Sequence, residues 1–186
     1  CDQIYSSRGQ KTIHAVANDL AASAAYAIAS AADRVFVTRM GAVGSVGVFA
    51  CHVDQSRADA KAGFNYEFVY AGARKIDGNA HQPLSEQAQE TLQAEVDRIH
   101  GVFCDTVARN RRVPVAKIQD TEADVFFADS ALPLLADQVG TTEDATAAME
   151  GKGGARQSTG SKKALANPSA AREKDDFDRV LEYCEL

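Results

Sequence analysis

Short blocks of apolar residues alternate along this chain between strand spacing and helix spacing. β-Branched and aromatic runs predict strands at residues 12–17, 34–38, 48–53, 65–70 and 124–127. Helices are predicted at residues 2–8, 21–32, 54–62, 114–120 and 130–136, the last shortened or kinked by Pro133. Glycine-rich loops are expected at 41–47 and 71–81. Strands and helices that alternate in this way are typical of an α/β protein.

The longest predicted helix follows Pro83, with Ser85 as its cap. Along it, four apolar residues recur at helical spacing, namely Leu92, Val96, Ile99 and Phe103. We interpret this stripe as core or as a contact between protomers, rather than as part of a site.

The composition changes after Glu150. Residues 151–172 contain no aromatic and no acidic side chain and are rich in Gly, Ser, Ala and Lys, which predicts a flexible linker. Residues 173–186 are acidic, with apolar residues at helical spacing, so they form either a short amphipathic docking helix or a frayed, solvated tail. We therefore expect a folded domain at 1–150, a linker at 151–172 and a possible docking helix at 173–186.

Charge and cysteine content exclude several classes of protein. A formal net charge of −6 argues against a nucleic-acid binder, which needs a basic surface. No apolar run is long enough to cross a bilayer. The four cysteines are scattered without metal-ligand or disulfide spacing, which indicates reduced thiols, no metal site and no cofactor. The chain begins at Cys1, so we expect it to be part of a longer product.

Ser23 is the serine best placed for chemistry. It lies at the predicted start of a helix after a strand and a polar loop, among alanines that would let a substrate backbone approach. Helix N–H groups at that point would favour a developing oxyanion. The alternative is that Ser23 is simply a small residue in a packed alanine helix.

A serine nucleophile needs a base, and the candidates are few. None of the four histidines has the marks of a catalytic triad; the alternative base among them is His52, which precedes Asp54. A lysine serves as base only where burial or nearby positive charge favours the neutral amine. Lys75 follows a predicted buried strand, and its neighbour Arg74 could help or could simply be solvated.

Three ordered motifs resemble peptidase family S49, the signal peptide peptidase A type. They are LAASAAYAIA at 20–29, VGSVGV at 43–48 and YAGARKID at 70–77. These correspond to the nucleophile segment, a Thr-Gly-Ser-Ile-Gly-type segment and the segment that ends in the base lysine. The similarity covers roughly residues 2–149, and three motifs in one register are far more specific than one alone.

The resemblance implies a ClpP/crotonase-type α/β fold, built of repeated strand-strand-helix units with its N-terminal part missing. It implies Ser23 as nucleophile, Lys75 as general base and Ser45 as the residue that orients Lys75. Because nucleophile and base in this family can come from adjacent protomers, it also implies a ring-like homo-oligomer.

Two features depart from the family pattern. Ala24 and Ala25 replace glycines that commonly follow the nucleophile, as in the family's phage branch. The upstream Ser-Pro-Gly-Gly-type segment, which supplies an oxyanion N–H, is absent. Loss of such a donor costs about 100- to 1000-fold in rate, so we expect the 186 residues alone to be impaired.

Within the family, the segments around Ser23, His52 and Lys75 look most like head maturation proteases of tailed phages and prophages. The expected function is a serine endopeptidase that cleaves scaffold or capsid proteins in the procapsid or the bacterial cytoplasm. Alternatives are a signal peptide peptidase, a truncated inactive assembly module and, as a weaker reading, an acyl-CoA enzyme of the crotonase fold.

Overall fold

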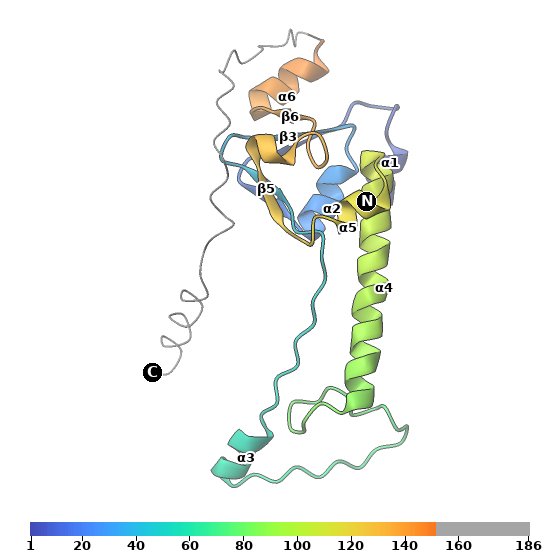
Figure 1. Ribbon diagram of the computed structural model, residues 1–186, viewed down its shortest axis with the longest axis vertical. Helices are drawn as coiled ribbons and strands as arrows, with labels where there is room; N and C mark the ends of the chain where they lie inside the picture. Colours follow the sequence, from blue (N-terminus) through green and yellow to red (C-terminus); the bar gives the residue numbers. More distant parts are fainter. Residues whose placement is uncertain (152–186) are drawn as a thin grey trace. The chain divides into compact units, whose positions relative to one another are not determined.

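A computed structural model describes residues 1–151 (Figure 1). The predicted linker, apart from Gly151, and the predicted docking helix lie outside the described residues. The described helices are α1 (Asp2–Ser6), α2 (Ala24–Ser30), α3 (Ser56–Ala62), α4 (Glu86–Arg111), α5 (Val115–Gln119) and α6 (Thr142–Met149), with a 3₁₀ turn η1 (Ala128–Ala131). The strands are β1 (His14–Ala17), β2 (Leu20–Ala22), β3 (Arg34–Val37), β4 (Ala42–Gly44), β5 (Val125–Phe127) and β6 (Gln138–Val139).

The described strands form two small sheets, which makes this a mixed α/β protein. One sheet has the order β1-β3-β6 and is parallel throughout. The other has the order β2-β4-β5, with β2 parallel and β5 antiparallel to β4. β3 and β4 are buried along most of their length, as strands covered on both faces should be.

The hydrophobic core lies between the sheets, α2 and the last turns of α4. Its largest fully buried side chains include Tyr26, Phe36, Ile118 and Leu135. The Tyr26 hydroxyl donates to the Leu135 carbonyl at 2.8 Å, and burial raises the pKa of this phenol well above its ordinary value. Tyr26 therefore fixes α2 against the turn after η1.

Arg8 closes the same region from the N-terminal side. Its guanidinium donates to carbonyls at the end of α2, including Ser30 at 2.9 Å and Ala31 at 2.9 Å. It also reaches the Asn110 carbonyl in the last turn of α4 at 3.1 Å. These carbonyls have no partner within their helices, so one cation satisfies the ends of two helices at once.

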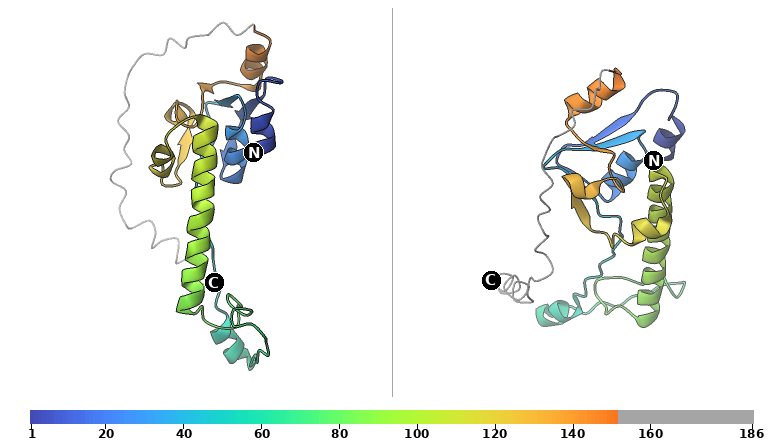
Figure 2. Two further views of the ribbon diagram at one scale, coloured as in Figure 1. Left: turned by 90° about the vertical axis from the view of Figure 1, so that its right-hand side faces the viewer. Right: turned by 45° about the horizontal axis from the view of Figure 1, so that its top comes forward.

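α4 runs from the sheets to a separate set of elements, which we call the arm and define as residues 54–85 (Figure 2). Buried residues of α4 concentrate in its last turns, at Cys104, Val107, Ala108 and Asn110. The residues that follow β4 extend along the helix, and α3 lies near its first turn. The Ser85 side chain caps α4 by accepting from the Ala88 amide at 3.2 Å, which confirms the predicted cap.

Several predicted elements differ in the structure. The expected helix at 21–32 begins with strand β2, because Ala21 and Ala22 pair with β4 and this tertiary pairing overrides the helix propensity of alanine. Residues 48–53 and 65–70, predicted as strands, have no ladder partner among the described residues and are not assigned as strands. The helix predicted at 130–136 is only the turn η1, since Pro133 stops it.

Candidate active site

Ser23 occupies the single residue between β2 and α2. Its φ and ψ are 54° and −125°, a conformation that costs a non-glycine residue free energy and occurs mainly where the surrounding structure enforces it. The Ser23 amide donates to the Gly44 carbonyl at 2.9 Å, and its carbonyl accepts from the Ala27 amide at 3.0 Å. A serine at a sharp strand-to-helix turn presents its hydroxyl outward, as nucleophilic serines require.

The Ser23 hydroxyl makes no capping hydrogen bond to α2. A serine at a helix start usually caps the first turn, so this hydroxyl is left for another partner. The residue is half-buried, while Ala24 and Ala25 beside it are exposed. The exposed Ala24 and Ala25 leave the surface beside Ser23 open.

Ser45 stands next to Ser23 at the end of the neighbouring strand. Parallel pairing places Ala22 opposite Gly44, so the next residues of the two strands, Ser23 and Ser45, emerge at the same edge. Ser45 also has a positive φ, 53°, and its amide donates to the Asp124 carbonyl at 2.8 Å. The structure thus brings together two of the three predicted site residues.

Gly44 is required at this edge for two physical reasons. Its φ is +124°, which side chains rarely tolerate, and a Cβ there would lie 2.6 Å from the Asp124 carbonyl oxygen. The glycine therefore allows the backbone at Ser23, at Gly44 and at Asp124 to approach closely, and hydrogen bonds between these segments fix both serines.

A cavity of about 500 Å³ opens beside Ser23. Most of its wall is apolar and comes from α2, from the segment after β4 and from α4; it is lined by Cys1, Asp2, Ser23, Ala24, Ala27, Gly47, Val48, Phe49, Ile99, Val102, Phe103 and Thr106. At the rim, Arg109 donates to Asp2 at 2.6 Å and holds the pKa of that carboxyl below its usual value. The cavity has the size and lining of a site for an apolar side chain.

The contribution of α4 to this cavity was not predicted from the sequence. The apolar stripe was expected to be core or interface. Phe103 does pack against the hydrophobic core, but Ile99 and Phe103 also line the Ser23 cavity. Leu92 and Val96 line a second cavity of about 540 Å³ between α4 and residues 48–52. Helical spacing identifies an apolar face of a helix but does not show what that face contacts. The sequence therefore could not distinguish residues that line a cavity from residues of the core or of an interface.

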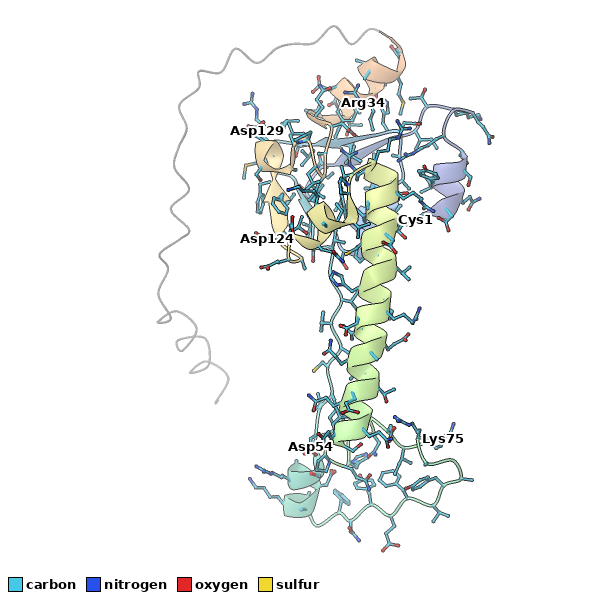
Figure 3. All side chains as sticks on the ribbon, turned by 45° about the vertical axis from the view of Figure 1, so that its right-hand side comes forward. Cys1, Arg34, Asp54, Lys75, Asp124 and Asp129 are labelled. Atoms are coloured by element: carbon cyan, nitrogen blue, oxygen red, sulfur yellow. The ribbon has the colours of Figure 1, made fainter. Side chains whose placement is uncertain are left out.

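Lys75 does not reach Ser23 within this chain. It lies in the loop of the arm, and Figure 3 shows it at the opposite end of α4 from Cys1, which borders the Ser23 cavity. Its neighbour Arg74 donates to Thr91 near the start of α4, whereas the α4 residues that line the cavity begin at Ile99. Ile99 lies eight positions after Thr91 on the helix, a rise of about 12 Å.

The histidines offer no substitute base beside Ser23. His52 Nε2 is buried and makes no hydrogen bond within the described residues. Among those residues, the histidine paired with a carboxylate is His81, on the arm. The Cys104 thiol lies 3.2 Å from His100 Nε2, but burial raises the pKa of that thiol and so disfavours its nucleophilic form. Ser23 is a half-buried hydroxyl that lines the cavity, and none of the four histidines is among the cavity's lining residues.

The family model for peptidase family S49 matches residues 6–156. This chain belongs to peptidase family S49. It is 36% identical over 149 residues to "Head-tail preconnector protein GP5" of Enterobacteria phage P21, which covers 80% of this chain and 30% of that protein. It is 35% identical over 158 residues to "Capsid assembly protease C" of Escherichia phage lambda, covering 84% of this chain and 36% of that protein.

A plant protein is also similar. "Serine protease SPPA, chloroplastic" of Arabidopsis thaliana is 28% identical over 111 residues, 59% of this chain and 16% of that protein. The S49 chain spans about a third of the length of its two phage relatives. Of the helices that the structure describes, none has both the length and the apolar character to cross a membrane.

Proposed function

We propose that this chain carries the catalytic serine and lysine of an S49 serine endopeptidase. Ser23 is the nucleophile, Lys75 the general base and Ser45 the residue that orients the lysine. The observation that carries the proposal is the geometry of Ser23, which has a positive φ at a strand-to-helix junction. Its hydroxyl makes no capping hydrogen bond, and the residue lines an apolar cavity of about 500 Å³.

The base must come from a second copy of the chain. Lys75 and the Ser23 cavity lie at opposite ends of α4, so one chain holds two half-sites. Lys75 is also exposed, and a lysine works as a base only where its surroundings favour the neutral amine. A neighbouring subunit that places Lys75 beside Ser23 and Ser45 would both complete the site and remove the lysine from water.

Uncovered apolar side chains support this assembly. Phe49 is 89% exposed and Val69 is 102% exposed, and both lie in extended segments without a ladder partner in the described part of the chain. Val102, on the exposed face of α4, is 56% exposed. Phe49 and Val102 line the same cavity, and exposed apolar side chains that adjoin one another in this way mark a surface that a partner covers.

The chemistry follows from this arrangement. Ser23 Oγ attacks the peptide carbonyl while its proton passes to the Lys75 amine, and an acyl-enzyme ester forms when the peptide C–N bond breaks. The Lys75 ammonium returns the proton to the leaving amine. Water then attacks the ester, and Lys75 again accepts and returns a proton, so that Ser23 is regenerated.

The order of elements supports a ClpP/crotonase-type architecture. β1, β2 and α2 are followed by β3 and β4, and the second pair adds to the first in parallel, with β3 beside β1 and β4 beside β2. A repeated strand-strand-helix unit accounts for this order. We propose that the described residues form part of such a repeat.

The phage relatives suggest the substrate class. One of them is a capsid assembly protease by name, and the other a head-tail preconnector protein. We propose that this chain acts on proteins of an assembling phage shell. An apolar cavity beside the nucleophile would hold a side chain next to the cleaved bond.

Complementation between two inactive variants tests the proposal. Ser23→Ala and Lys75→Ala should each abolish peptide hydrolysis alone. When differently tagged copies are co-expressed, a site that combines an intact Ser23 with a neighbour's intact Lys75 arises by chance at about a quarter of the interfaces of a closed ring. We therefore expect about a quarter of wild-type activity. Mixed oligomers with no recovered activity would contradict a dyad shared between subunits.

A further inference from the structure

The arm contains a second polar cluster, separate from Ser23. Asp59 on α3 faces His81, whose Nδ1 lies 2.8 Å from Asp59 Oδ2. An ionised carboxylate only accepts hydrogen bonds, so this ring nitrogen carries a proton and donates. The Tyr66 ring stacks on His81 with ring centroids 3.8 Å apart and planes at 19°.

The cluster continues by hydrogen bonds into the loop that carries Lys75. The His81 amide donates to Asn79 Oδ1 at 3.0 Å, and Asn79 Nδ2 donates to the Ile76 carbonyl at 2.7 Å. Ile76 is the residue after Lys75. A second connection runs from α3, where the Gln55 amide donates to the Ala80 carbonyl at 2.7 Å.

Burial of apolar side chains alone does not explain why the loop that carries Lys75 adopts one conformation. α3 has no buried residue, and most residues of 64–75 are exposed. By contrast, the Asp59 side chain is 16% exposed and that of His81 is 32% exposed. Asp59 and His81, which connect α3 to the Lys75 loop, are thus shielded from water more than most of the arm. Hydrogen bonds to a charged group are stronger than bonds between neutral groups.

We propose that Asp59 and His81 are positioning residues for Lys75. They hold the loop at 71–81 against α3, so that the lysine enters the neighbouring subunit's site in one orientation. This inference rests on the proposed role of Lys75. Displacement of a catalytic group by about 1 Å can lower the rate of an enzyme by about 100-fold. Because few side chains of this loop are buried, hydrogen bonds such as that between Asp59 and His81 are needed to fix the position of Lys75.

The first test measures steady-state kinetics of the full chain. Asp59→Ala and His81→Ala should lower kcat by about tenfold to 100-fold with little change in KM, since substrate binds beside Ser23 and not at the arm. The double variant should be no worse than either single variant, because both break one connection. Asp59→Asn keeps an accepting oxygen and should retain much of the activity. Glu67→Gln, at an exposed carboxylate of the same arm, is the matched control.

The second test uses the complementing pair of variants. Asp59→Ala placed in the Ser23→Ala subunit, which supplies Lys75, should reduce the recovered activity by the same tenfold to 100-fold. Placed in the Lys75→Ala subunit, which supplies Ser23, it should leave the recovered activity unchanged. A general effect on folding or assembly would act from both subunits.

The two proposals fail in different ways. If the parent mixture is active and Asp59→Ala acts equally from both subunits, the positioning role is wrong and the shared dyad stands. If the parent mixture is inactive, the shared dyad fails, and unchanged kcat in the single Asp59 and His81 variants would then overturn the positioning role as well. Hydrogen exchange at 71–81 should rise in Asp59→Ala and stay constant in Glu67→Gln.

Discussion

Ser23 and Ser45 emerge side by side from the ends of two paired parallel strands, with φ values of 54° and 53°. Both depend on the backbone of Gly44, whose carbonyl accepts from the Ser23 amide at 2.9 Å. The nucleophile and the residue proposed to orient the base are therefore held by one local structure. Lys75, by contrast, belongs to the arm.

Replacement of Ser45 by Ala should lower kcat without unfolding the protein. If its hydroxyl orients the Lys75 amine, loss of that hydrogen bond should cost about tenfold to 100-fold in kcat, with KM nearly unchanged. Steady-state hydrolysis of a peptide checks this. A serine-reactive phosphonate should still label Ser23 in the variant, at a reduced rate. Unchanged kcat would limit Ser45 to a role in the turn.

Gly44→Ala should destabilise the fold and the site together. The new Cβ would meet the Asp124 carbonyl oxygen at 2.6 Å in a backbone with φ +124°, so we expect a loss of about 2 kcal/mol or more. Gly63→Ala is the matched control: its φ is +81° but a Cβ there meets nothing within 4 Å, and about 1 kcal/mol is expected. Denaturant unfolding measures both. Equal losses would contradict the close approach at Gly44.

The Arg111–Asp137 ion pair should make the free energy of unfolding depend on pH in the acidic range. Arg111 donates to both Asp137 oxygens, at 2.8 and 2.9 Å, and its side chain is 6% exposed. Burial alone would raise the pKa of Asp137, but hydrogen bonds from Arg111 and the Val35 amide outweigh it, and the net pKa is lowered. A carboxyl with a lowered folded pKa stabilises the protein above its unfolded pKa, near 3.9, and the gain is lost as pH falls through the folded value.

Asp137→Asn should therefore lose about 3 kcal/mol at pH 7, because it leaves a buried cation without its charge partner. The difference from wild type should shrink as pH falls below about 4. Denaturant midpoints across this range provide the measurement. Asp120→Asn, in the exposed Lys117–Asp120 pair at 3.9 Å, should barely change stability at any of these pH values. A constant difference between Asp137→Asn and wild type at all pH values would argue against the lowered pKa.

Val102→Trp should change which peptides are cleaved. Val102 lines the cavity beside Ser23 and is exposed enough to be enlarged without disturbing the core. We expect kcat/KM to fall at least about tenfold for a peptide with a large apolar side chain before the cleaved bond. For a peptide with alanine at that position, kcat/KM should stay within about twofold of the wild-type value. An equal loss for both peptides would place substrate side chains elsewhere.

Local sequence signals predicted the elements whose stability is decided locally. Ser85 and the long helix after it were expected from a cap and from helical spacing, and β3 and β5 from β-branched and aromatic runs. Ser23 and Ser45 were identified through motifs, and the structure places both at one edge. Their juxtaposition depends on the register of β2 with β4, which neither segment encodes alone.

Other features depend on contacts between distant residues and could not be read from local pattern. Ala21 and Ala22 favour a helix by propensity, yet pairing with β4 makes them a strand. Residues 65–70 have a strand's composition, but a strand also needs a neighbour for its hydrogen bonds, and the described chain provides none. Asp59 and His81 lie 22 residues apart and meet only because the arm folds back. Similarly, the order of the motifs indicated that Ser23 and Lys75 act together. The tertiary structure shows that they lie far apart within one chain, because α4 is a rigid helix that fixes the distance between the segments at its two ends.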